Sequence, residues 1–152
     1  DRFDTELRRI YTVVAPSFSE NFLATPIAED EFIEQYAQVR PFVRPELVLL
    51  AEREGETIGF MFVLPDWLQA QRGEAVTTVI VKTLAVAPAY AGRGLATLLS
   101  ARVQDAARQL GYKRAIHALM HERNTSRRIS SRFAGHIIRR YTLFARPVAG
   151  TP

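Results

Sequence analysis

The sequence predicts a single α/β domain in which helices flank a central mixed sheet of six strands. Its 152 residues, 47% of them hydrophobic, are enough for one sizeable core. Apolar residues recur at helical spacing in some segments and form strand-like runs in others. The longest run rich in β-branched residues leads directly into a glycine-containing loop and a helical pattern, so a strand, a loop and a helix follow one another.

Two short helices are expected near the N-terminus, over residues 4–14 and 29–39. In the first, Leu7, Ile10 and Val14 recur at helical spacing, and the second also places its apolar side chains on one face. The prolines between and after these segments indicate loops that fit helix boundaries better than domain boundaries.

The middle of the chain has the pattern of β-structure. Residues 46–52 and 57–65 are predicted to form a hairpin whose turn lies near Gly55. A polar stretch, 66–74, follows. The run 75–86 is then expected to be a central, mostly buried strand.

The second half is predicted to alternate between helix and strand. A helix is expected to begin at about Gly94 and to end at Gly111, a residue type common just after helices. Residues 113–120 form the next predicted strand, 124–133 a short arginine-rich helix and 136–148 a final strand.

No repeat, low-complexity tract or linker interrupts the pattern, so residues 1–152 are expected to form one domain, which can be part of a longer chain because the sequence begins with Asp1. No run approaches the roughly 20 apolar residues of a membrane span, and no signal-peptide pattern is present. We therefore expect a soluble, cytoplasmic protein. The absence of cysteine excludes disulfides, thiolate metal sites and cysteine nucleophiles.

Charge is distributed unevenly along the chain. Residues 1–89 carry 8 basic and 14 acidic side chains, whereas residues 90–152 carry 12 basic side chains against Asp105 and Glu122. A basic half can attract nucleic acid, an acidic membrane surface or a polyphosphate cofactor, and its arginines can equally be solvated without a ligand.

The loop between the long strand and the next helix has the sequence PAYAGRG. Glycines at positions 92 and 94 let the backbone turn so that several N–H groups converge at a helix N-terminus, an arrangement that binds phosphate. A glycine turn that only joins a strand to a helix is the structural alternative. The loop lacks the lysine and hydroxyl ending of a P-loop, and the third glycine position and repeated βαβ pattern of a Rossmann site.

The stretch VAPAYAGRGLATLL resembles motif A of the GNAT N-acetyltransferases, and the resemblance covers residues 47–144. It implies a mostly antiparallel mixed sheet and acetyl-CoA as co-substrate, without a metal. One position departs from the motif, because Ala91 replaces a glutamine or arginine. The residues that the resemblance assigns to the cofactor are Leu84, Ala85, Val86, Ala91, Gly92, Arg93, Gly94, Ala96, Thr97 and Asn124.

The catalytic residues are less clearly indicated. Many family members place a tyrosine about seven residues after the asparagine, where it protonates the departing thiolate, but this chain has Ser131 there. Serine is a far weaker acid, so a water relay through Ser131, another residue such as Tyr141, or no dedicated acid remain open. For the general base we favour His121 or Glu122 over His117.

The sequence therefore predicts an acetyl-CoA-dependent N-acetyltransferase that transfers an acetyl group directly to a primary amine of a small-molecule or peptide acceptor in a ternary complex. The alternative is a non-catalytic acyl-CoA-binding regulatory domain. No nucleic acid or membrane partner is expected, and homodimerisation, common in the family, stays open, as do the acceptor and the acyl chain length. The candidates for acceptor contact are Phe18, Asn21, Phe22, Asp66 and Trp67, together with their ordinary interpretation as packing residues.

Overall fold

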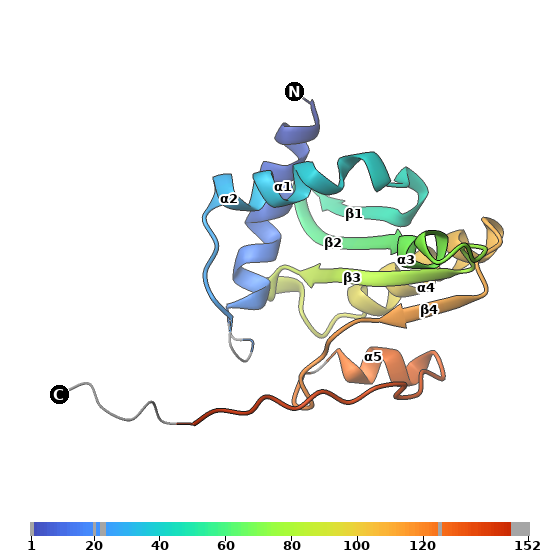
Figure 1. Ribbon diagram of the computed structural model, residues 1–152. Coiled ribbons are helices and arrows are strands. Elements are labelled where there is room, and N and C mark those ends of the chain that lie inside the picture. The colour runs from blue at the N-terminus through green and yellow to red at the C-terminus, as the bar shows by residue number, and fades with distance from the viewer. Residues whose placement is uncertain (1, 20, 22–23, 125, 147–152) are drawn as a thin grey trace.

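A twisted sheet with strand order β1–β2–β3–β4 organises the molecule in this computed structural model (Figure 1). The structure describes residues 2–19, 21, 24–124 and 126–146. Within that part of the chain the sheet has four strands, not the predicted six. The first two pairings are antiparallel and β3 pairs with β4 in parallel, which confirms a mixed, mostly antiparallel sheet flanked by helices.

The predicted hairpin is present as β1 (Val48–Arg53) and β2 (Glu56–Pro65). Its two-residue turn has positive φ at both positions, 54° at Glu54 and 84° at Gly55. Two positive φ values match the right-handed twist of the strands in a tight hairpin, which is why a glycine near position 55 marked the turn.

Both faces of β2 are buried, and its side chains alternate between two apolar clusters. Phe60 and Phe62 face α1 (Arg2–Phe18) and α2 (Glu29–Val39), whereas Met61 and Val63 face α4 (Leu95–Gln109), which lies behind the sheet in Figure 1. Each large apolar side chain buried in this way contributes about 1.5–3 kcal/mol to folding. Helices on both faces therefore explain why the middle of the chain is almost continuously apolar.

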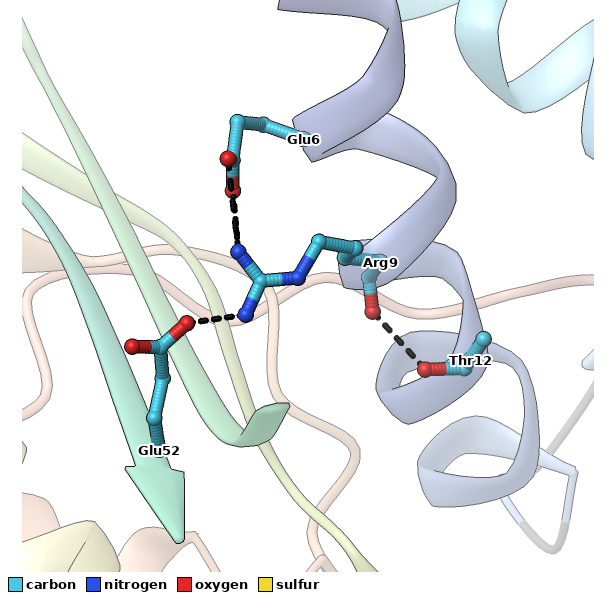
Figure 2. A network of polar contacts seen from close by, with 4 residues as sticks. All are labelled: Glu6, Arg9, Thr12 and Glu52. Carbon is cyan, nitrogen blue, oxygen red and sulfur yellow. Dashed lines mark hydrogen bonds and ion pairs between the residues drawn. The ribbon is translucent and has the colours of Figure 1, made fainter. Parts of the chain in front are cut away.

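A network of charged side chains ties α1 to the sheet edge at β1. Arg9 of α1 forms ion pairs with Glu6 on its own helix and with Glu52 on β1 (Figure 2). The two carboxylates raise the pKa of Arg9, so its charge persists at every accessible pH. The contact links α1 to the edge strand, while the packing of its buried face on β2 holds the helix across the sheet. The C-terminal end of α1 lies next to the end of β3.

The polar stretch after β2 contains a short helix, α3 (Trp67–Gln71). Asp66 caps it by accepting a hydrogen bond from Leu68 N. Gln69 is buried, and its Oε1 accepts hydrogen bonds from the backbone N–H groups of Thr77 and Thr78. This side chain thereby satisfies the backbone where β3 (Thr78–Val86) begins.

After α4 the described part of the chain forms fewer helices and strands than predicted. Gly111, with φ of 88°, follows the helix as expected, and the remaining elements are β4 (Arg114–His117) and α5 (Arg127–Arg132). The predicted strand over 136–148 is wrong for its described part, 136–146, which forms neither helix nor strand. In Figure 1 this segment runs past α5 instead of alongside β4. Without a neighbouring strand its alternating pattern forms no ladder, and 92% of the Phe144 side chain stays exposed.

No helix in the described ranges is long and apolar enough to cross a membrane.

Candidate active site

The glycine loop and the start of α4 form a cradle of backbone N–H groups. Gly92 and Gly94 adopt φ of 74° and 86°, a left-handed conformation that favours glycine. The first hydrogen bond of α4 runs from Leu98 N to Gly94 O at 3.0 Å. The N–H groups of residues 95–97 precede that bond, so they point out of the helix end, where its dipole favours an anion.

Basic side chains of α5 add to the positive potential of this cradle. Arg132 reaches across to α4, and its Nη1 donates to Thr97 Oγ1 at 3.1 Å. Arg128 lines the same hollow, and no acidic residue is among the described residues that line it. Arg93 is turned aside, with its guanidinium 5.6 Å from the centre of the Tyr90 ring. The cradle is therefore a strongly anion-favouring place.

Among the described residues, no strand pairs with the edge of β3 next to the cradle. β4 pairs with β3 only from Thr78 to Val81, and an irregularity in the β2–β3 register lies between Phe62 and Val63. Ala87 N–H donates to Ile58 O, so by strand alternation the backbone groups of Leu84 and Val86 face the opposite, β4 side. Val86 O accepts a hydrogen bond from Ser17 of α1 at 2.8 Å. An extended ligand could pair with the rest of this edge.

Two adjoining cavities run along this edge. The outer cavity, of about 380 Å³, extends over the cradle, and the inner one, of about 290 Å³, reaches the end of β4. They share lining residues, including Leu84, Asn124 and Ile129, and together they are called the cleft. Of the ten residues predicted for the cofactor, the outer cavity is lined by Leu84, Ala85, Val86, Ala91, Gly92, Gly94, Ala96, Thr97 and Asn124, but not by Arg93.

Asn124 shapes the turn that precedes α5. Its Oδ1 accepts hydrogen bonds from Ser126 N at 2.9 Å and Ser126 Oγ at 2.6 Å. The asparagine was expected to begin a helix at residue 124, but α5 begins at Arg127. Its side chain therefore organises the backbone at the mouth of the cleft.

The structure brings none of the predicted catalytic residues to the cleft: His121, Glu122 and Ser131 do not line either cavity. His121 Nδ1 accepts a hydrogen bond from Arg123 N, and Glu122 is exposed. Ser131 is exposed, and its Oγ donates to Arg127 O within α5. Although these residues are close to Asn124 in sequence, their side chains do not reach the cleft, because the chain turns between β4 and α5.

His117 lines the inner cavity instead, although the sequence ranked it below His121 and Glu122. Its Nδ1 lies 2.7 Å from Ser130 Oγ on α5. Burial lowers the pKa of His117, so the ring is neutral at pH 7. No signal in the sequence marked this position, because the predicted strand extended to residue 120, whereas β4 ends at His117, where its parallel pairing with β3 stops.

The candidates for acceptor contact divide between two places. Phe18 and Asn21, at the end of α1, line both cavities. Asp66 and Trp67 lie at α3, where the Trp67 ring packs 5.9 Å from that of Phe42, outside the cleft. Phe22 lies outside the described residues. No group of three or more metal-ligating side chains is assembled anywhere in the described ranges.

Comparison with known proteins agrees with this geometry. The model of the acetyltransferase (GNAT) family matches residues 7–132. No curated protein matches the chain.

Solved structures share the fold at low identity. AAC(6')-Iy in complex with the bisubstrate analogue CoA-S-monomethyl-acetylneamine is 15% identical, over 95% of this chain and 93% of its own, with a TM-score of 0.66. The aminoglycoside antibiotic 6'-N-acetyltransferase AAC(6')-Ih from Acinetobacter baumannii is 16% identical, over 96% and 95%, with a TM-score of 0.68. A ribosomal-protein-alanine N-acetyltransferase from Brucella melitensis biovar Abortus 2308 is 14% identical, over 94% and 95%, with a TM-score of 0.67.

Proposed function

The chain belongs to the acetyltransferase (GNAT) family, and from that premise we propose that it transfers the acetyl group of acetyl-CoA to a primary amine of a small-molecule or peptide acceptor, directly within a ternary complex. The observation that carries this proposal is the cleft, whose outer cavity is lined both by the anion cradle at α4 and by the edge of β3 beyond its pairing with β4. A long ligand with a phosphate end and an amide-containing arm fits both features.

Each part of the cleft has a proposed role. Backbone N–H groups of the loop at Ala91–Thr97, with Arg128 and Arg132, hold the diphosphate. The edge at Leu84–Val86 pairs with the amides of the pantetheine arm. When bound, acetyl-CoA supplies an electrophilic thioester carbonyl. The chain orients the two reactants side by side, and such positioning accounts for a large part of rate enhancement.

The acceptor is proposed to enter beside the end of α1. Phe18 and Asn21 line both cavities, so an amine held there would border the inner cavity. Two of the similar structures are named as aminoglycoside N-acetyltransferases and one as a ribosomal-protein-alanine N-acetyltransferase. Both small amines and peptide N-termini therefore belong in a screen.

The test begins with calorimetric titration of acetyl-CoA and desulfo-CoA, followed by a thiol-release assay with neamine, spermidine and an alanine-initiated peptide. Because the sequence contains no cysteine, every thiol detected comes from CoA. Binding with thiol release on an amine supports the proposal. Binding without release on any amine favours the regulatory acyl-CoA-binding alternative, whereas an absence of binding overturns both.

A further inference from the structure

A histidine that lines the inner cavity is contacted by a serine from a separate element. His117 is the last residue of β4 and lines the cavity, whereas Ser130 lies on α5 next to that lining, with Nδ1 and Oγ 2.7 Å apart. The lining near His117 is mixed, with apolar side chains such as Val81 and Leu84 beside uncharged polar ones. Among the described residues of this lining, Lys82 is the other ionisable one, and its side chain is exposed.

The neighbours of Ser130 indicate which ring nitrogen of His117 is protonated. Ser130 Oγ also lies 3.9 Å from Met120 Sδ, within the range of an O–H donor to sulfur. A hydroxyl has one proton, so when Ser130 donates to Met120 it must accept from His117. Nδ1 then carries the hydrogen, and Nε2 is left with a free lone pair.

Resting on the acetyl transfer proposed above, we propose that His117, oriented by Ser130, carries the proton from the acceptor amine to the sulfur of CoA. Ser130 precedes by one residue the position where many family members have a tyrosine. Ser131, at that position, bonds within its own helix, whereas Ser130 is turned toward β4. In this chain the proton-transfer role that a tyrosine has in many family members is therefore proposed for His117 of β4, which Ser130 of α5 orients.

The step balances without any further reactant. The amine nitrogen forms a bond to the acetyl carbon while the bond from that carbon to sulfur breaks, so the nitrogen loses one proton and the sulfur gains one. Nε2 accepts the first proton and delivers it to the departing thiolate. Since burial keeps the ring neutral before the reaction, His117 is ready to accept.

Nuclear magnetic resonance of the ring nitrogens tests the arrangement in the full chain. The three histidines, His117, His121 and His136, are assigned by single substitution. We expect His117 to carry its hydrogen on Nδ1, to change tautomer in Ser130→Ala and to keep it in the matched control Ser131→Ala. Desulfo-CoA should shift the His117 nitrogens more than those of His136. The proposal is overturned if the chemical shifts of the His117 ring nitrogens change neither in Ser130→Ala nor on addition of desulfo-CoA.

Kinetics with the most active amine of the screen provide the second test. Removing a group that transfers a proton lowers turnover by about 10²–10⁴-fold. We expect His117→Gln to lower kcat by at least about 100-fold while acetyl-CoA affinity stays within about twofold, and His121→Gln to leave kcat unchanged. Retained binding also shows that the variant is folded. If His117→Gln does not fold, the proposal is tested by comparing Ser130→Ala with Ser131→Ala. A loss of kcat and an altered pH–rate profile are expected only for Ser130→Ala.

These outcomes separate the two proposals. If the wild-type protein does not bind acetyl-CoA, the proposed function is wrong. A wild-type protein that binds and acetylates an amine, with His117→Gln equally active, leaves the function standing and removes His117 from it.

Discussion

The two ends of the cleft are built by different means. The outer end is formed largely by the backbone of the loop at 91–97, whereas the inner end depends on the His117 side chain, which lines the cavity and is contacted by Ser130, 13 residues away on a different element. A site made of consecutive backbone is encoded locally, by glycines that permit the turn. A site made of side chains from separate elements exists only once those elements pack.

The two ends also differ in charge. Arg128, Arg132 and the N-terminus of α4 make the outer end of the cleft positive. At the inner end, burial keeps His117 neutral. The first can hold an anionic ligand and the second can exchange a proton, so substitutions at the two ends should change different measurements.

The largest expected effect on binding is at the cradle. Gly94→Glu adds a carboxylate where the diphosphate is proposed to lie, and like charges in such proximity cost several kcal/mol, so acetyl-CoA affinity should fall by about 100-fold or more in calorimetry. Gly73→Glu is the matched control, because both glycines have positive φ, 86° and 75°, and both have open space where a β-carbon would lie. Equal affinity losses in the two variants would attribute the effect to backbone strain.

Arg132→Ala should have a smaller effect at the same end. Loss of a charge-assisted contact costs about 1.5–3 kcal/mol when fully formed, and exposure reduces this, so we expect about tenfold weaker acetyl-CoA binding at low salt. The difference should shrink as salt is raised. Arg123→Ala, which removes an exposed arginine outside the cleft lining, should bind like the wild type; a salt-independent loss would contradict a phosphate contact.

Ser17→Ala tests the anchoring of the β3 edge, which both ends share. Its hydroxyl lies 2.8 Å from Val86 O and 2.6 Å from Val13 O of its own helix, and its one proton is shared between the two oxygens. Removing the hydroxyl should therefore lower the free energy of unfolding by at most about 1 kcal/mol. Urea denaturation measures this difference. Ser19→Ala, whose hydroxyl bonds to Pro16 O at the exposed end of α1, is the control and should change stability less.

The smallest expected effect is a pH dependence of stability from the inner end. The pKa of His117 is lower in the folded protein than in the unfolded chain, so the unfolded chain binds the proton first as the pH falls. Stability from this source is complete above the unfolded pKa and declines below it, until the pH passes the lowered folded pKa. Urea denaturation at pH 7.5 and 5.5 should show a shallower decline for His117→Gln than for His121→Gln, and equal declines would contradict a buried, neutral His117.

Much of the fold was predictable because its local signals agree with its packing. The helix at 29–39, the hairpin around Gly55 and the strand ending at Val86 were all predicted and observed. The predicted strand over 136–148 was wrong for its described part, 136–146, because apolar and β-branched residues show only that a segment can pair. Whether it pairs depends on the route of the chain past α5, which no local pattern records.

By itself the sequence determined the order of strand, glycine loop and helix, and with it the cradle, because left-handed glycines and the end of a helix act within a few residues. Only the tertiary structure decided which histidine faces the cleft. His117, not His121, lies there because parallel pairing with β3 fixes the end of β4, and α5 packs back to bring Ser130 within 2.7 Å of its ring. Contacts of that kind depend on elements that meet only in the folded chain.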